Sequence, residues 1–368
     1  MHHLAGGVPQ CIFRDLAKKY GPLMHLHLGE VSTVVVTSSE MDKQVLKTHD
    51  LAFASRPRLM AVDIMCYDRS DIAFCPYGGF YMADIFPSYK FLHSLSSAKQ
   101  TLLDIHRKVY STVEDVINEH KKNLSTHETD DALGGEDLIN VLLRHKKDGA
   151  LQFAITNDNI KVVILDMLIA GTKTSAVTIV WAMVQKMKNP SIFVKAQKEV
   201  RKSFRDKVTF NSNDVEEQKY LKLVIKETLK LHPPIPLLTP RECREETYIN
   251  GYTIPVNTKV MVNVWALGRD PKYWDDAKSF KPERFEQCSV DFLGNNFEYL
   301  PFGSGRRICL GISFSLASIS LPLAQLLYHF DWKLPTGMEL RDLDFTELAG
   351  IGSMRKNDLY LITTPYKS

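Results

Sequence analysis

One uncharged segment near the C-terminus, from Ile308 to Phe330, constrains the fold of this chain more than any other feature of the sequence. The segment contains no Asp, Glu, Lys or Arg and is long enough to cross a bilayer as a helix. Its serines, Pro322 and Gln325 do not favour contact with lipid. We therefore expect a helix buried in the core of a globular protein.

The composition is that of an ordinary globular protein. Among 368 residues, 46 Lys and Arg against 43 Asp and Glu give a net charge of +3, and hydrophobic residues make up 44%. These values exclude disordered, collagen-like and coiled-coil classes, and so small a net charge gives no reason to expect a nucleic-acid partner. Six cysteines without C-x-x-C spacing argue against a zinc ribbon or a disulfide scaffold, so we expect reduced thiols in a protein that faces the cytosol. The cysteines are Cys11, Cys66, Cys75, Cys243, Cys288 and Cys309.

Hydrophobic periodicity and turn residues predict a mainly helical protein with a minor β-sheet, in a single domain over residues 1–368. Short strands are expected near residues 23–28, 32–38 and 358–364, and β-hairpins over 247–265 with Asn250-Gly251 as a turn. Residues 51–90 and 268–306 are expected to be irregular. The remaining predicted helices cover residues 8–21, 38–50, 95–124, 134–146, 156–188, 189–204 and 214–231.

The most informative motif is PFGSGRRICLG, Pro301–Gly311, which places one cysteine in a glycine-rich turn directly before the uncharged helix. Backbone N–H groups and the dipole at a helix N-terminus stabilise a thiolate. Glycines let the backbone pass close to a flat ligand, and Arg307 can pair with an anionic group such as a propionate. The alternative interpretation is a buried structural cysteine after a turn.

This loop resembles the cysteine loop of the cytochrome P-450 family, F-x-x-G-x-R-x-C-x-G. All five fixed positions are present, as Phe302, Gly305, Arg307, Cys309 and Gly311. The resemblance implies the cytochrome P-450 fold and a haem b cofactor (iron protoporphyrin IX), with Cys309 as the axial thiolate of the iron. It also implies that Arg307 and Arg241, the arginine in TPRECRE, face the haem propionates.

Three further segments resemble the same family in its usual order. Glu227, in KETLKLHPP, stands at the first position of the family's E-x-x-R helix, and Lys230 stands at the last. Arg284, in FKPERF, corresponds to the arginine that completes this brace and holds the loop before the cysteine. The segment DMLIAGTKTS corresponds to the distal helix over the haem, which implies catalytic positions for Gly171 and Thr174.

The resemblance implies a monooxygenase that inserts one oxygen atom from O2 into an apolar small molecule, of the plant terpenoid-oxidising type. Electrons would come from NADPH through a cytochrome P-450 reductase, and the enzyme would act at the cytosolic face of the endoplasmic reticulum membrane. The family's N-terminal anchor is absent from this sequence, so we expect a soluble protein or one with peripheral membrane contact. The segments that face substrate in the family are apolar here, which suits an apolar substrate, although the same residues also read as core. Their key residues are Leu168, Ile235, Leu237, Leu238 and Ile351.

Two lysines depart from the family pattern. Lys173 replaces the acid before Thr174, so the acid and alcohol that together relay protons are no longer both present, and we expect slower or uncoupled turnover. Lys230 replaces the arginine of E-x-x-R, and a point charge cannot reproduce the planar fork of a guanidinium. We therefore expect a looser brace for the cysteine loop.

An internal block of the family is also missing. DIAFCPYG, Asp71–Gly78, runs directly into GFYMADIFPSYKFLH, which resembles a region much further along in relatives. We expect a sheet and helix part over 1–78, a deletion near 78–79 and a helical haem-binding core over 79–368. The loss should expose apolar faces of the helices at 156–188 and 309–330, and therefore cause poor haem binding or aggregation.

Three other functions stay open from the sequence. One is a non-catalytic or haem-poor remnant of the family, which the missing block and Lys230 favour. Another is a haem-thiolate enzyme that rearranges peroxides and needs no acid–alcohol relay, which Lys173 permits and Gly171 with Thr174 disfavours. The third is a helical binding module without haem.

Overall fold

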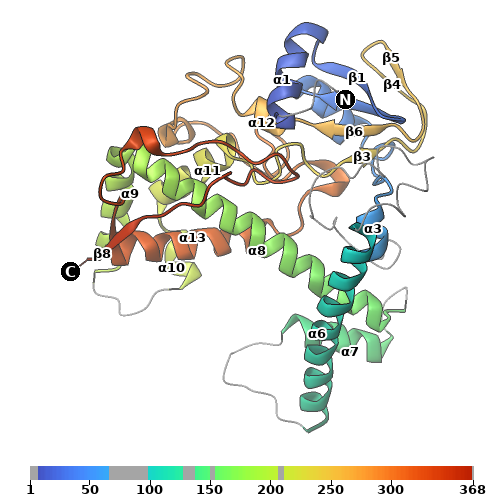
Figure 1. The fold of residues 1–368 in the computed structure, drawn as a ribbon, viewed down its shortest axis with the longest axis horizontal. Coiled ribbons are helices and arrows are strands. Elements are labelled where there is room, and N and C mark those ends of the chain that lie inside the picture. Colours follow the sequence, from blue (N-terminus) through green and yellow to red (C-terminus); the bar gives the residue numbers. More distant parts are fainter. Residues whose placement is uncertain (1–6, 66–97, 127–136, 150–153, 206–210, 367–368) are drawn as a thin grey trace. The chain divides into compact units, whose positions relative to one another are not determined.

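The computed structural model describes residues 7–65, 98–126, 137–149, 154–205 and 211–366. The chain divides into two compact units (Figure 1). The first unit comprises Met1–Pro57 and Lys173–Ser368, and the second comprises Arg58–Thr172. Helix α8, Asn157–Lys188, runs through the division and contributes to both units. The predicted mainly helical fold with a minor sheet is confirmed.

The first unit contains a four-stranded sheet in the order β1-β2-β6-β3. Strands β1, Leu23–Leu28, and β2, Val31–Val36, pair antiparallel as a hairpin, as predicted. Strand β6, Lys259–Val262, pairs with β2 in parallel, and the short strand β3, Arg241–Glu242, closes the other edge of β6.

The predicted hairpin around Asn250-Gly251 is confirmed, but its predicted extent is wrong. Strands β4, Thr247–Ile249, and β5, Tyr252–Ile254, pair alone, while β6 joins the other sheet. The following residues form a short helix, α12, Val264–Leu267, where a strand was expected. The Asn263 side chain explains the change, because it accepts a hydrogen bond from the N–H of Ala266 at 3.1 Å and so caps the helix.

The helical part of the first unit surrounds a core formed by one face of α13, Ile312–His329, and by α9, Pro190–Ser203, with two further helices. These are α10, Ser212–Glu216, and α11, Lys219–Leu231, where the sequence predicted a single helix over 214–231. The break arises because the carboxylate of Glu199 accepts hydrogen bonds from the N–H groups of Tyr220 and Leu221, at 2.9 and 3.0 Å, and so starts a new helix there.

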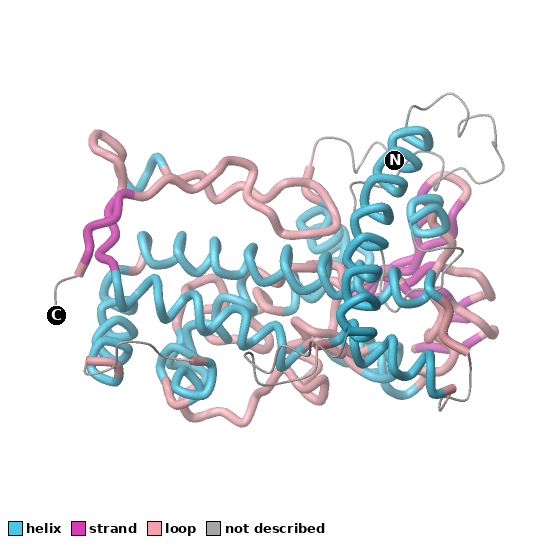
Figure 2. The backbone as a smooth tube through the Cα atoms, turned by 90° about the horizontal axis from the view of Figure 1, so that it is seen from below, coloured by secondary structure: helices cyan, strands magenta, loops and turns pink. Residues whose placement is uncertain are grey.

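The remaining elements of the first unit lie around its sheet and its C-terminal strands. Helix α1, Pro9–Tyr20, precedes β1, and α2, Ser39–Lys43, follows β2 and continues as a π-helical turn over Gln44–Thr48. Figure 2 shows the β7–β8 pair at the opposite end of the first unit from the four-stranded sheet. These strands span Phe330–Lys333 and Ile362–Pro365, and 3₁₀ turns span Pro282–Phe285, Gly305–Arg307 and Leu340–Asp342.

The second unit is mainly helical in its described part. It contains α3, Met60–Met65, α6, Ala98–Thr126, α7, Leu138–Asp148, and the first half of α8. Helix α3 lies within the segment that was expected to be irregular. The predicted junction at residues 78–79 lies outside the described residues.

Both long apolar helices leave much of their surface uncovered. By length and composition α8 and α13 could each cross a membrane, but one or two such helices are weak support for a membrane protein. One face of α13 is buried in the core through Ile319, Leu323 and Leu327, as expected of a core helix. In contrast, Leu310 just before the helix is 81% exposed and Phe314 in its first turn is 52% exposed.

Candidate functional site

The loop around Cys309 is closed by its own backbone. The N–H of Cys309 donates to the carbonyl oxygen of Phe302 at 3.0 Å, and helix α13 begins three residues after the cysteine. Gly305 has a φ of +70° in this loop, and a Cβ there would lie 1.9 Å from the carbonyl oxygen of Leu46. Only glycine therefore fits, because the loop runs directly against the π-helical turn that contains Leu46.

Cys309 is an exposed residue of this loop, but its sulfur is partly buried. Burial of the sulfur raises the pKa of Cys309, and a hydrogen bond from the backbone of Gly311 opposes the rise without cancelling it. The turn and the helix N-terminus therefore do not by themselves bring the pKa of Cys309 below its usual value. A coordinating metal ion deprotonates such a thiol outright, so a sulfur held beside glycines suits a metal ligand.

Arg241 lies buried beside the same loop with a donor left over. Its Nη2 donates to the carbonyl oxygen of Ser304 at 2.8 Å, whereas its Nη1 is buried and has no hydrogen-bond partner within the described part of the chain. Burial first, and then the charge of Arg307, lower the pKa of Arg241 to about 10, and the carboxylate of Asp50 opposes this only in part. The guanidinium groups of Arg241 and Arg307 carry like charges, and Nη1 of Arg241 is a donor without a partner in the described part of the chain. Both features fit a ligand that carries carboxylates.

Arg307 lies nearby and is exposed. Its Nε donates to the carbonyl oxygen of Ala54 at 2.9 Å, which fixes the side chain against the segment after the π-helical turn. Its neighbour Arg306 forms an ion pair with Asp50 at 3.3 Å, a contact that nothing in the sequence motif indicates. Together the cysteine, the glycines and the two arginines Arg241 and Arg307 fit a flat, iron-containing ligand with carboxylate side groups, as haem is.

The three residues of the predicted brace meet in the core. Glu227 accepts a hydrogen bond from Lys230 Nζ at 3.1 Å on one oxygen and from Arg284 Nε at 3.0 Å on the other. Lys230 also donates to the carbonyl oxygen of Ala277 at 3.0 Å, and the side chains of Glu227 and Lys230 are both fully buried. Lys230 therefore completes the brace, but it reaches only one oxygen of the carboxylate.

The brace ties α11 to the long loop that leads to Cys309. Arg284 donates to the carbonyl oxygens of Asp275 and Ser279, at 2.6 and 3.2 Å, and the N–H of Lys281 donates to Glu227 at 3.2 Å. Burial raises the pKa of Glu227, while burial lowers the pKa of Lys230 to about 8 despite the attraction of Glu227. The ion pair thus carries a large desolvation cost.

The residues predicted to lie over the haem all belong to α8, and the boundary between the two units falls among them. Thr174 and Lys173 belong to the first unit, and the carbonyl oxygen of Thr174 accepts a hydrogen bond from the Thr178 hydroxyl at 3.0 Å. Gly171 and Leu168 belong to the second unit, where the Leu168 side chain is 55% exposed.

The other predicted pocket residues come from two segments that touch. The N–H of Ser353 donates to the carbonyl oxygen of Pro234 at 3.0 Å, which joins the segment of Ile351 to that of Ile235. Leu238 packs toward the cysteine loop, since a Cβ on Gly303 would lie 3.7 Å from its Cδ1. Leu237 is buried in the first unit, as expected if it is a core residue and not a substrate contact.

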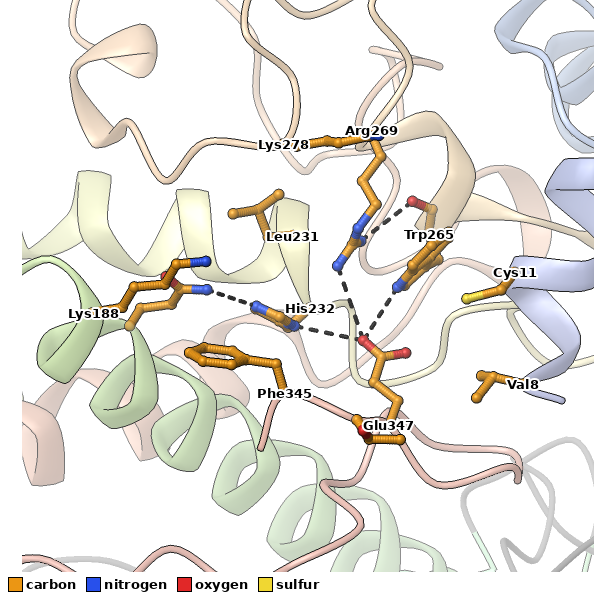
Figure 3. A pocket seen from close by; sticks show the side chains of 12 residues that line it. Val8, Cys11, Lys188, Leu231, His232, Trp265, Arg269, Lys278, Phe345 and Glu347 are labelled. Atoms are coloured by element: carbon orange, nitrogen blue, oxygen red, sulfur yellow. Dashed lines mark hydrogen bonds and ion pairs between the residues drawn. The ribbon is translucent and has the colours of Figure 1, made fainter. Parts of the chain in front are cut away.

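Sequence reasoning missed a buried polar cluster around Glu347. Its carboxylate accepts hydrogen bonds from Gln10 Nε2 at 2.6 Å and Trp265 Nε1 at 3.2 Å, and it faces His232 and Arg269 (Figure 3). These residues come from four separate segments, so neither local spacing nor a motif could have indicated the cluster.

Comparison with known proteins gives the same family over nearly the whole chain. The family model for cytochrome P-450 matches residues 1–77 and 79–362. A premnaspirodiene oxygenase of Hyoscyamus muticus is 59% identical over 454 positions, which cover 100% of this chain and 90% of that protein. A 5-epiaristolochene 1,3-dihydroxylase of Nicotiana tabacum is 58% identical over 456 positions, covering 100% and 90%. The alignment with the tobacco enzyme spans 456 positions and this chain has 368 residues, so 88 aligned positions or more have no counterpart here.

The fold agrees with solved structures. A zebra fish cytochrome P-450 solved with progesterone superimposes with a TM-score of 0.81 at 22% identity, covering 98% of this chain and 100% of that one. At this identity the likeness shows the fold alone. With the family model and the two plant relatives, it establishes that the chain belongs to the cytochrome P-450 family of haem-dependent monooxygenases.

Proposed function

We propose that this protein inserts one oxygen atom from O2 into a terpenoid of low polarity. Two relatives of nearly 60% identity carry names that state oxygenation of premnaspirodiene and hydroxylation of 5-epiaristolochene. The segments that contain Ile235 and Ile351 are apolar and joined by a backbone hydrogen bond, which suits a substrate with few polar groups.

Cys309 is the proposed ligand of the haem iron, and this assignment carries the function. The sulfur belongs to a closed loop, and Gly311 lies beside it, where a Cβ would be 3.9 Å from the sulfur. Arg241, with its unpaired Nη1, and Arg307 would bind the two carboxylates of the cofactor. When bound, haem with a thiolate ligand supplies the chemistry of O2 activation.

Thr174 is the proposed residue that holds a proton near the reacting oxygen. Its hydroxyl can donate and accept, whereas Lys173 cannot take the part of a neighbouring carboxylic acid in a proton relay. We propose that water supplies the protons that Thr174 passes on, and that Lys173 makes this delivery slow. Electrons would come from NADPH through a cytochrome P-450 reductase at the endoplasmic reticulum membrane. Gly171 and Leu168 would lie on the distal side of the haem, with Leu168 facing the substrate.

Reconstitution with haem tests the assignment of Cys309. The chain is expressed with excess haem, reduced and exposed to carbon monoxide, and the difference spectrum is recorded for wild type, Cys309→Ala and Cys288→Ala. Cys288 is the matched control, because it is also an exposed free cysteine. We expect a thiolate-type Soret band that Cys309→Ala abolishes and Cys288→Ala leaves intact. Equal bands in all three proteins would exclude Cys309 as the ligand.

Product formation tests the reaction. Turnover of a sesquiterpene hydrocarbon should require both NADPH with reductase and O2. A product formed from a lipid hydroperoxide without either would instead support the peroxide-rearranging alternative.

A haem-poor remnant of the family is the second candidate function. The family-model match is interrupted at residue 78, and the tobacco relative has 88 or more aligned positions that this chain lacks. We propose that the gap is real in this chain and weakens haem retention. Sequencing of the transcript across Gly78-Gly79 decides this, since a transcript that encodes the block would contradict it.

A further inference from the structure

A cavity of about 360 Å³ opens in the first unit, and none of its lining residues belongs to the cysteine loop. Its walls are partly aromatic and aliphatic, formed by Val8, Leu231, Trp265 and Phe345. This volume is within the range of small-molecule sites, where apolar walls with a few polar groups are usual. The polar groups of the cavity therefore decide what it can bind.

Glu347, the one carboxylate in the lining, is already satisfied by the protein (Figure 3). It accepts from Gln10 and Trp265 and pairs with Arg269, whose Nη2 lies 3.9 Å away. Burial raises the pKa of Glu347, but the nearby ring of His232, whose Nδ1 lies 3.6 Å away, and the charge of Arg269 outweigh it, so its pKa lies below the usual value. This carboxylate is thus charged, and Arg269 already pairs with its charge.

His232 is neutral and adds no charge to the lining. Burial lowers its pKa to about 4. Its Nε2 lies 2.9 Å from the amide nitrogen of Gln185, which can only donate, so the ring proton is on Nδ1 and points toward Glu347. The Gln185 amide is itself fixed, since its Oε1 accepts from Asn189 at 2.9 Å.

Two lysines give the cavity a positive charge that nothing offsets. Lys188 and Lys278 line it, and neither forms an ion pair with an acidic residue in the described part of the chain. The ammonium of Lys188 lies 4.8 Å from the centre of the Phe345 ring, so the charge lies directly on the aromatic wall. The charges of Arg269 and Glu347 cancel one another. Lys188 and Lys278 therefore determine the sign of the net charge of the lining.

We propose that this cavity is a binding site for a small organic anion, a carboxylate on a flat apolar body. The aromatic and aliphatic walls take the body, and Lys188 and Lys278 take the carboxylate. The site is independent of the haem site, since the two share no lining residue.

Calorimetric titration of the full chain tests the proposal with naphthalene-1-acetate and its neutral amide. We expect one-to-one binding of the acid, with the amide about 10-fold weaker or more, because two rim charges are together worth about 1.4 kcal/mol. The double variant Lys188→Glu with Lys278→Glu should remove this preference. Lys202→Glu, an exposed lysine on α9, is the matched control and should bind as wild type does.

A filling variant separates the cavity from other apolar surface. Thr346→Trp places an indole at the lining and should abolish binding of both compounds, whereas Thr363→Trp on β8 should leave binding unchanged. Equal affinity for acid and amide, or unchanged binding in the double lysine variant or in Thr346→Trp, would each overturn the proposal, as would the lack of saturable binding to the wild type.

Discussion

Lys230 Nζ donates a hydrogen bond to Glu227 Oε1 over 3.1 Å in a core where neither side chain is exposed. Arg284 binds the other oxygen of the same carboxylate at 3.0 Å. The brace before the cysteine loop is therefore complete in this chain with a lysine in place of the arginine that the family motif has. Its weakness lies in the desolvation of a compact ammonium, which a single carboxylate oxygen and one carbonyl only partly offset.

Replacement of Lys230 by Met should raise the free energy of unfolding at pH 7 by about 1–3 kcal/mol, because the buried charge of Lys230 costs more in desolvation than Glu227 returns, while Glu227 keeps Arg284 as a partner. Urea unfolding followed by circular dichroism measures this. Lys219→Met on the same helix is exposed and should change the free energy by no more than about 0.5 kcal/mol. Similar values for the two variants would show that the buried charge of Lys230 carries no net cost.

The pH dependence of stability should carry the signature of Lys230. Its pKa is about 8 in the folded chain against the usual 10.5, so between these values the unfolded chain binds more protons. The free energy of unfolding should therefore rise with pH from about 8 to 10.5, relative to the Lys230→Arg variant, whose guanidinium stays charged. Parallel pH profiles of the two proteins would contradict the lowered pKa.

Asp42 is a buried carboxyl group on α2 that destabilises the fold. Both of its oxygens lack hydrogen-bond partners within the described residues, and burial raises its pKa well above the usual value. The unfolded chain ionises at lower pH than the folded one, so the fold loses stability as pH rises above about 4. Asp42→Ala should raise the free energy of unfolding at pH 7 by about 1–3 kcal/mol, the cost of an unsatisfied buried group.

The control for this prediction is Asp42→Asn, which removes the charge and keeps an unsatisfied polar group. It should lose the pH dependence that wild type shows without the full gain of Asp42→Ala. Chemical unfolding at pH 4 and pH 7 distinguishes the three proteins. A gain from Asp42→Ala that is as large at pH 4 as at pH 7 would show that ionisation of Asp42 is not the cause.

Arg241 should contribute to haem retention through its unpaired Nη1. Arg241→Leu should weaken haem binding about 10-fold or more, since it removes a charged, buried donor for a carboxylate. Arg244→Leu, three residues along and exposed, is the matched control. Transfer of haem to an excess of apomyoglobin measures the loss rate. Equal rates for the two variants would remove Arg241 from the site.

Local pattern was enough to predict the helices that begin and end at clear signals. Helix α9 starts at Pro190 and α1 ends before Gly21, and both bounds follow from those residues. The pairing of β2 with β6 could not be predicted, because a parallel pair joins segments far apart in the chain and leaves no local signal. The break between α10 and α11 depends on Glu199 of another helix, which is a tertiary contact.

In the candidate site, too, some features could be predicted from the sequence and others could not. The motif around Cys309 and the resemblance identified Arg241, Glu227 and Arg284 as its companions, and the structure brings all of them to the loop or to its brace. The sequence could not show that burial keeps the pKa of Cys309 high, because this depends on packing. For the same reason it could not reveal the cluster around Glu347.

Gly305 offers the sharpest test of how the cysteine loop is seated. Its φ is +70°, and a Cβ would lie 1.9 Å from the carbonyl oxygen of Leu46, so Ala must both strain the backbone and push the loop from the π-helical turn. Gly337 has a φ of +85° with nothing within 4 Å of a Cβ, so Gly337→Ala carries the strain alone, about 1–2 kcal/mol. We expect Gly305→Ala to lose more stability than Gly337→Ala in urea unfolding, and to lose haem in the reduced carbon monoxide spectrum, which Gly337→Ala should retain. If the two variants match in both measurements, the contact with Leu46 does not seat the loop, because backbone strain is common to both and only the contact differs.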